Sequence, residues 1–523
     1  MPEGSLKINV LKFKSSILKL ALFATGLSGI VAEYILSTLA TYFLGDSAVQ
    51  WALIVSVMLF SMGIGSRLSQ YFKTQLLIKF IYIEFALSLL VSFSSTFTYF
   101  LSGFSDYIGL IIYSLSIVIG VLIGMEIPLV IRLNKQFQEL RINVASVMEK
   151  DYWGSLAGGL FFAFVGLPYL GLTYTPFVLG FINFLVAILL LVYVRRSLGV
   201  APLRQMGLAG ATLLAVIITG VFWAKPVILY GEQARYQDKV IYARQSKYQR
   251  VVLTQWRNEY WLYLNGNQQL STIDEVMYHE PLVHPAMQLG IPKRDVLVLG
   301  GGDGCAVREI LKYPSVQSIT VVDLDSLVTH LAKTHPVLTE LNDSALHHPK
   351  VEILHRDGFT FLEQQAGFYD AIIVDLPDPR SVELNRLYTV EMYHFCRKAL
   401  RPGGVLITQA GSPYFATKAF TCINKTMQAA HFYTAPLHNH VLTLGEWGWV
   451  LGMRSPDSIN VTKALQNITF EPVNTQWINR DAMQLMTHFG KGIYGRDTGE
   501  VEVNRIHHPV LYRYYLKGNW DLY

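Results

Sequence analysis

The most constraining feature of this sequence is a series of long apolar stretches within its first 225 residues. Seven stretches of about 18 to 26 residues lack the polar face of a soluble helix, and each is long enough to cross a bilayer. They lie near residues 17–40, 49–69, 76–101, 107–131, 153–170, 174–194 and 207–224. We therefore predict an all-α, multi-span transmembrane domain over residues 1–225, in contact with lipid in a cell (inner) membrane.

The basic residues of this half predict its orientation, because Lys and Arg remain on the cytoplasmic side of short loops. They precede the first stretch and follow the second, fourth and sixth: Lys7, Lys12, Lys14, Lys19, Arg67, Lys73, Arg132, Lys135, Arg141, Lys150, Arg195, Arg196 and Arg204. The N-terminus is therefore expected in the cytoplasm. Seven crossings would leave the second half outside, in conflict with the cytoplasmic location that its chemistry favours below. Either 207–224 or the Gly/Pro-rich pair around 166–176 does not cross fully, or the second half faces the periplasm.

The second half has the pattern of a soluble α/β protein. In residues 226–290, "KVIYARQS", "YQRVVLTQW" and "EYWLYLNGNQQL" alternate polar and apolar residues around an Asn-Gly turn, which predicts a small antiparallel sheet. In residues 291–452, "DVLVLG", "SITVVDLD", "VEILHRD", "YDAIIVDLPD" and "GGVLITQAG" alternate with helical patterns. These predict a doubly wound, Rossmann-like parallel sheet. Residues 453–523 form an extension of unknown role, for which we expect packing on the domain or the membrane surface.

The stretch "LVLGGGDGCAVREIL", residues 297–311, predicts a strand, a glycine turn and a helix. Such a turn brings backbone N–H groups and a helix N-terminus to a ligand. A dinucleotide fingerprint running from Gly300 through Gly302 would need a third glycine where this chain has Cys305, so NAD is disfavoured. Asp303, inside the turn, would repel a pyrophosphate or a carboxylate. It favours a positively charged ligand.

Four further acids follow the ends of the neighbouring strands. Asp323 stands where an acid accepts the hydroxyls of a ribose, Asp357 where an adenine amino group can be met, and Asp375 and Asp378 close the fourth strand. Together with Asp303 they predict a pocket for a positively charged nucleoside beside a second pocket for a polycation. The alternative is that each aspartate only caps the helix after its strand.

Composition excludes other classes of function. The net charge is +5 and lies largely in the membrane loops, which does not indicate nucleic-acid binding. The three cysteines form no C-x-x-C pair and are expected to be reduced thiols. His347 and His348 lack metal-ligand spacing to Cys or Asp, so no metal site is predicted.

The soluble half resembles the spermidine synthase (polyamine aminopropyltransferase) family over about residues 245–452. The resemblance rests on "YQRVVL", "LNGNQQLSTIDEVMYHEPLVHPAM", the glycine-turn segment, "RDGFTFL", "YDAIIVDLPDP" and "GEWGWVLG", in this order. The segments "GLSGIVAEYILSTLATYFLGDS" and "GMEIPL" are similar to the multi-span domain fused to some of these synthases. The resemblance implies the fold of S-adenosylmethionine-dependent methyltransferases, and self-association into homo-oligomers.

The same resemblance implies the reaction. Decarboxylated S-adenosylmethionine would be a co-substrate, without any prosthetic group, and its aminopropyl group would pass to a polyamine such as putrescine. The products would be spermidine and methylthioadenosine.

The roles implied by the resemblance can be placed residue by residue. Gln249 and Gln269 would line the donor site, and Gln269 would also bind substrate. Gly300 and Gly302 would form the glycine turn of the donor site. Asp303 would hold the aminopropyl ammonium, Asp323 the ribose and Asp357 the adenine. Asp375 would be the base, aided by Tyr278, while Asp378 and His279 would position the amine.

Three departures from the family pattern leave the acceptor open. Leu376 and Pro377 stand between the two aspartates in place of small polar residues, the Gly-Pro that usually follows the Asp-Pro is missing, and Gln409 lies where some relatives have an acid nearby. Putrescine is the default acceptor, and a longer polyamine, agmatine or an unrelated amine also fits.

Two other functions stay open. A small-molecule methyltransferase of the same fold is disfavoured by Asp303. A membrane polyamine sensor or transporter is disfavoured by Asp375 with Tyr278, but the spans and their acids Glu33, Glu84 and Glu126 keep it open.

Overall fold

The computed structural model describes residues 3–45, 47–105, 107–135, 139–195, 198–455, 457–471, 473–490 and 500–520, without the side chains of residues 3–15. Arg196 and the side chains of Lys7, Lys12 and Lys14, used in the orientation argument, lie outside the described residues. The chain forms two compact units, Met1–Val240 and Ile241–Tyr523. Helix α7 continues through Ala234, so the first unit extends beyond the predicted limit at residue 225.

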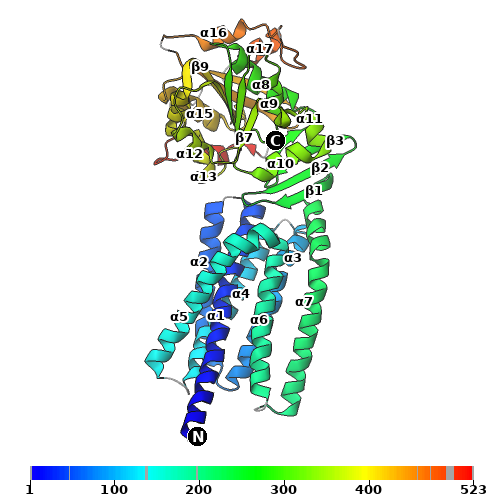
Figure 1. Ribbon diagram of the computed structural model, residues 1–523, viewed down its shortest axis with the longest axis vertical. Helices are drawn as coiled ribbons and strands as arrows, with labels where there is room; N and C mark the ends of the chain where they lie inside the picture. The colour runs from blue at the N-terminus through cyan, green and yellow to red at the C-terminus, as the bar shows by residue number, and fades with distance from the viewer. Residues whose placement is uncertain are drawn as a thin grey trace. The chain divides into compact units, whose positions relative to one another are not determined.

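Long helices make up the described part of the first unit (Figure 1). They are α1 (Glu3–Leu44), α2 (Ser47–Leu68), α3 (Leu76–Ser102), α4 (Ile108–Asn134), α5 (Leu140–Phe161), α6 (Gly171–Val194) and α7 (Val200–Ala234), with the short helices η1 (Ser69–Tyr71) and η2 (Phe162–Leu170). Six segments of the described chain are long and apolar enough to cross a membrane. One of them, 140–194, contains two of the seven predicted stretches; η2 lies between α5 and α6, and Gly171, with a φ of 61°, is the first residue of α6.

Glycines allow these helices to pack closely. A Cβ at Gly124 of α4 would lie 2.0 Å from the carbonyl oxygen of Met62, and one at Gly154 of α5 would lie 2.0 Å from that of Phe23. Small residues at helix contacts are typical of membrane proteins, whose helices gain little from the hydrophobic effect against each other. Glu84 and Glu126 are fully buried in this packing.

The second unit begins with the predicted antiparallel sheet. Its strands are β1 (Lys239–Gln245), β2 (Arg250–Trp256), β3 (Glu259–Leu264) and β4 (Asn267–Ser271), which neighbour one another in sequence order. Asn265 and Gly266 take φ values of 50° and 79° between β3 and β4, as the Asn-Gly turn predicts.

A seven-stranded sheet follows, in the order β10-β11-β9-β8-β5-β6-β7. The five predicted strands are confirmed as β5 (Asp295–Gly300), β6 (Ser318–Val322), β7 (Val351–Leu354), β8 (Tyr369–Asp375) and β9 (Leu400–Gly411), and they run parallel. The sheet is mixed, however, because β10 (Tyr433–Val441) and β11 (Gly445–Met453) add an antiparallel pair that was not predicted. Edge strand β10 is polar at alternate positions and carries Pro436, which weakens its strand signal.

Helices cover both faces of this sheet. They are α8 (Val276–Gln288), α9 (Cys305–Leu311), α10 (Ser326–Thr334), α11 (Pro336–Leu341), η4 (Ala345–His347), α12 (Gly358–Glu363), α13 (Val382–Asn385), η5 (Arg386–Tyr388), α14 (Val390–Ala399), α15 (Thr417–Ala429), α16 (Val461–Gln466), α17 (Arg480–Met486) and α18 (Leu511–Leu516). Val296 and Val298 of β5 belong to one hydrophobic cluster, and Leu297 and Leu299 belong to another. Because successive strand residues point to opposite faces, both faces are buried, as in doubly wound folds.

The C-terminal extension packs on this unit. The buried carboxylate of Glu280 accepts the backbone N–H groups of Gln476, Trp477 and Ile478 at 2.6, 2.8 and 2.8 Å. Farther along, the side-chain amide of Asn504 donates to the carbonyls of Asn385 and Tyr388 at 3.2 and 3.0 Å. These contacts bring α18 to the edge where the parallel strands end.

Candidate active site

The glycine turn joins the ends of β5 and β8. Gly300 has a φ of 76°, and a Cβ there would lie 2.0 Å from the carbonyl oxygen of Asp375, so only glycine fits. The N–H of Gly301 donates to that carbonyl at 3.1 Å. The turn that carries Asp303 is thereby fixed beside the end of the strand that carries Asp375.

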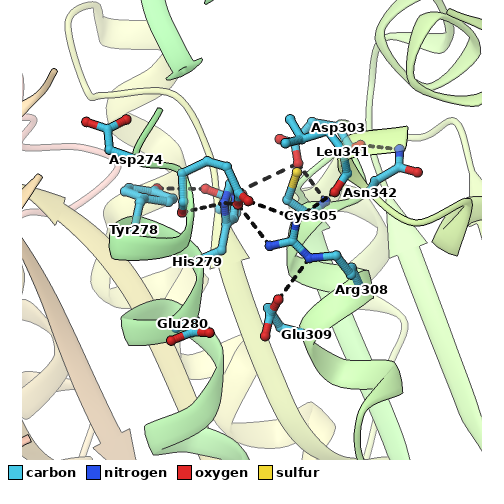
Figure 2. Close-up of polar contacts among 12 residues, drawn as sticks. Asp274, Tyr278, His279, Glu280, Asp303, Cys305, Arg308, Glu309, Leu341 and Asn342 are labelled. Carbon is cyan, nitrogen blue, oxygen red and sulfur yellow. Dashed lines mark hydrogen bonds and ion pairs between the residues drawn. The ribbon is translucent and has the colours of Figure 1, made fainter. Parts of the chain in front are cut away.

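Helix α8 supplies two side chains to the same place (Figure 2). The Tyr278 hydroxyl donates to Oδ1 of Asp375 at 2.7 Å. The Nε2 atom of His279 lies 3.8 Å from Oδ1 of Asp303 and 4.0 Å from Oδ2 of Asp375. Four predicted site residues, Tyr278, His279, Asp303 and Asp375, therefore converge on one point.

The charges in this cluster stabilise one another. Burial opposes the charged form of His279, but its hydrogen bond with Glu275 and the charges of Asp303, Glu275 and Asp375 outweigh burial and raise its pKa to about 9. Burial, and then the charge of Asp303, raise the pKa of Asp375 to about 6, against the opposing effects of His279 and Tyr278. An imidazolium thus separates two carboxyl groups that would otherwise repel each other.

His279 is itself oriented by residues that the sequence analysis missed. Its Nδ1 atom lies 2.8 Å from Oε2 of Glu275, and Arg308 donates to both oxygens of that carboxylate at 2.8 and 3.0 Å. Burial alone would raise the pKa of Glu275, but the bonds from His279 and Arg308 hold it below its usual value. The spacing of Glu275 and His279, four residues apart on one helix, was the available sequence signal.

Asp323 lies beside the glycine turn. A Cβ at Gly302 would lie 2.5 Å from Oδ2 of Asp323, so this glycine leaves room for the carboxylate. Burial raises the pKa of Asp323 to about 6. Gln249 donates to Oδ2 of Asp325, two residues after Asp323, at 3.0 Å, which places it at the same strand end.

Asp357 shows the alternative role of an aspartate after a strand. Its Oδ1 atom accepts the N–H of Thr360 at 2.9 Å and caps α12, while Oδ2 pairs with Arg386. Asp357 therefore caps a helix whether or not it also meets an adenine. Gln269 donates to the carbonyls of Asn267 and Gln268, both at 3.2 Å, rather than to any of the site acids.

The carboxylate of Asp378 is held by one residue from a distant part of the chain and by one neighbour. Its Oδ2 atom accepts the hydroxyl of Tyr515 at 2.6 Å and Nη2 of Arg380 at 3.3 Å. Its Oδ1 atom is buried without a hydrogen-bond partner. Gln409 donates to the carbonyl of Leu376 at 2.8 Å, so it supports the loop between Asp375 and Asp378. Tyr515 belongs to the extension for which no chemistry was predicted.

Metal binding at the cluster is opposed by its protonation state. His279, Asp303 and Asp375 offer three ligand atoms within 4.8 Å of one another. However, a metal needs a neutral imidazole nitrogen, and the pKa of His279 is about 9. A second group of three possible ligands contains Glu275, His279 and Cys305. Burial and the charge of Asp303 raise the pKa of Cys305 well above its usual value, which disfavours a thiolate ligand.

Comparison with known proteins places this geometry in context. The Spermine/spermidine synthase domain matches residues 275–464. Polyamine aminopropyltransferase 2 of Aquifex aeolicus is 39% identical, covering 96% of this chain and 99% of that protein. The polyamine aminopropyltransferases of Leptospira interrogans and Oceanobacillus iheyensis are each 37% identical, covering 93% and 95% of this chain and 95% and 96% of theirs. A solved spermidine synthase in complex with the transition state analogue AdoDATO aligns with a TM-score of 0.45 at 25% identity, over 50% of this chain and 88% of that one.

Proposed function

Because this chain belongs to the polyamine aminopropyltransferase family, we propose that Asp375, Tyr278, His279 and Asp303 carry out the aminopropyl transfer. The enzyme transfers the aminopropyl group of decarboxylated S-adenosylmethionine to a primary amine such as putrescine. Spermidine and methylthioadenosine are the products. The observation that carries the assignment is the convergence of a tyrosine, a histidine and two aspartates where β5 and β8 end.

The donor is selected by charge. Asp303 lies in the turn where an ordinary methyl donor would place its carboxylate, and two negative charges at such a distance repel each other. The decarboxylated donor presents an ammonium, which Asp303 attracts. Asp323, half-buried beside Gly302, accepts the ribose hydroxyls, and Gln249 supports that strand end through Asp325.

The acceptor needs a base. An alkyl ammonium has a pKa of roughly 10, so the amine arrives protonated and has no free electron pair. Asp375 accepts the proton of the acceptor ammonium. Because the pKa of Asp375 is raised to about 6, this transfer is about 3 kcal/mol less unfavourable than transfer to an ordinary aspartate. The Tyr278 hydroxyl holds Oδ1, which leaves Oδ2 to face the amine.

The displacement itself balances simply. The amine nitrogen forms a bond to the aminopropyl carbon, the bond between that carbon and the sulfonium sulfur breaks, and the sulfur keeps the electron pair. The proton goes to Asp375. Positioning of the two reactants supplies much of the rate.

Product analysis tests this assignment. Detergent-purified full-length protein is given decarboxylated or ordinary S-adenosylmethionine with a panel of amines, and products are identified by mass spectrometry. We expect methylthioadenosine and an aminopropylated amine from the decarboxylated donor only, and neither product from Asp375→Asn. Asp343→Asn is the matched control, because Asp343 is exposed and its φ of 51° suits asparagine.

Each other outcome contradicts a stated step. Turnover by Asp375→Asn at the wild-type rate excludes Asp375 as the base. Methylated products from ordinary S-adenosylmethionine favour the methyltransferase. Binding of the nucleoside without turnover of any amine favours a sensor or transporter.

We also propose that the first unit is a multi-pass membrane domain in contact with lipid and that the catalytic unit faces the cytoplasm. Six apolar segments and exposed apolar side chains such as Phe60, Phe164 and Phe222 support the membrane location. All three cysteines are buried, so a single exposed cysteine at Ala366→Cys would report the side of the catalytic unit to an impermeant maleimide. Labelling in intact cells would contradict the cytoplasmic placement. Self-association stays a prediction, which light scattering of the purified protein tests.

A further inference from the structure

The carboxylate of Asp378 is held in an unusual way for a residue that would receive a cation. One oxygen already has two donors, Tyr515 and Arg380, while the other oxygen is buried and has none. Tyr515 and Arg380 lie outside the family motifs, and a role for them at this carboxylate rests on the proposed function.

Tyr515 is built into its position. Its side chain is 2% exposed, its ring lies 4.6 Å from that of Trp520, and it packs against Gly411, where a Cβ would lie 3.4 Å from Cε2 of Tyr515. The helix that carries it is anchored by Asn504, whose Oδ1 atom accepts the N–H groups of Val510 and Leu511 at 3.1 and 3.4 Å. The hydroxyl therefore reaches Asp378 from a rigid support.

Arg380 brings a permanent positive charge to the same carboxylate. Its Nη2 atom lies 3.3 Å from Oδ2 of Asp378 and 3.3 Å from the Tyr515 hydroxyl, and its guanidinium carbon lies 5.5 Å from the centre of the Tyr515 ring. Its Nη1 atom bonds Oδ1 of Asn267. The ion pair with Arg380 offsets much of the negative charge of Asp378, and Oδ1 is the oxygen that remains free to accept a hydrogen bond.

We propose that Tyr515 and Arg380 determine which amines the enzyme accepts. Tyr515 is a positioning residue that fixes the Asp378 carboxylate so that Oδ1 receives one ammonium of the acceptor. Arg380 neutralises the same carboxylate and repels any further ammonium group. The subsite therefore selects short linear diamines over triamines, which carry an additional positive charge.

Steady-state kinetics of three variants test the two roles separately. Tyr515→Phe keeps the packed ring and removes the hydroxyl that holds the Asp378 carboxylate, so we expect the KM for the diamine to rise about tenfold. The KM for the donor and kcat stay within about twofold. Tyr514→Phe, which removes a neighbouring hydroxyl bonded to the N–H of Glu502, is the matched control and leaves all three constants unchanged.

Arg380→Met keeps an unbranched apolar chain in place of the aliphatic part of the side chain and removes the charge. Its side chain is 43% exposed, so the substitution leaves no cavity in the core. We expect kcat/KM for spermidine to rise about tenfold more than kcat/KM for putrescine, because only the triamine brings the extra charge.

The outcomes separate this inference from the proposed function. If the wild type converts no amine, the proposed function fails. If the wild type is active but Tyr515→Phe behaves like Tyr514→Phe, the positioning role is wrong. If Arg380→Met changes kcat/KM for the diamine and the triamine equally, the charge-selection role is wrong.

Discussion

We propose that the charge on His279 sets the pH above which Asp375 can act as the base. We predict that His279→Gln, which removes the charge but keeps a polar atom near the position of Nε2, raises the pKa of Asp375. The base works only when it is unprotonated, so activity is present above its pKa and is lost as the pH falls through it. The acid limb of the pH profile, near pH 6 in the wild type, should therefore move to higher pH.

The size of the shift follows from the geometry. His279 Nε2 lies 4.0 Å from Oδ2 of Asp375. Two unit charges at that distance interact by about 4 kcal/mol at an effective dielectric constant of 20, which corresponds to roughly three pKa units. Glu275, 2.8 Å from Nδ1, neutralises part of the imidazolium. We therefore expect a shift of about one to two units.

The assay is kcat/KM for the acceptor between pH 5 and 8, where the amine itself stays almost fully protonated. His284→Gln is the matched control, because His284 is buried on the same helix but bonds Glu309 and Tyr313 instead of the site acids. The acid limb of the His284→Gln variant should stay near pH 6, whatever the effect of this substitution on stability. An unchanged limb in His279→Gln would refute the idea that the imidazolium sets the pKa of Asp375.

Three further predictions concern the donor pocket and the extension. Gly302→Ala places a Cβ 2.5 Å from Oδ2 of Asp323, so the KM for the donor should rise at least about tenfold. The KM for the acceptor should stay unchanged, and a rise in both constants would indicate a general distortion of the site. Because the pKa of Asp323 is raised to about 6, its carboxylate is lost as the pH falls through that value, and donor affinity measured by calorimetry should weaken about tenfold from pH 7 to pH 5; a flat profile contradicts this. Glu280→Gln leaves three backbone N–H groups with a poorer acceptor and should lower the free energy of unfolding by about 2 to 4 kcal/mol. We expect a lower thermal midpoint and faster hydrogen exchange in residues 473–490. Unchanged exchange would show that Glu280 does not hold the extension.

The sequence predicted the parts of this protein that depend on local pattern. Five buried strands and the Asn-Gly hairpin carry strong periodic signals, and acids that follow parallel strands must meet at one edge of the sheet. For the same reason Asp303 and Asp375 could be placed together before the structure was known. Tyr278 and His279 entered through the family motif, and the structure brings them to those acids.

Other features depend on contacts that no local pattern records. Strand β10 lies at the edge of the sheet, where alternate residues are polar, so its signal is weak, and β11 beside it contains Gly445, Gly448 and Gly452, which are poor strand formers. Tyr515 is one of several tyrosines in a stretch without periodicity, and only the folded chain places its hydroxyl on Asp378. Arg308 acts through Glu275, a partner 33 residues away in sequence. Such long-range partners are set by tertiary packing.

The hydrogen bond between Tyr515 and Asp378 joins residues 137 positions apart. Loop closure over such a separation costs chain entropy, so we expect this contact to form late in folding. A refolding enzyme should therefore regain donor binding, which depends on the turn after β5, before it regains discrimination among amines. Acceptor selectivity is then a sensitive reporter that folding has reached completion.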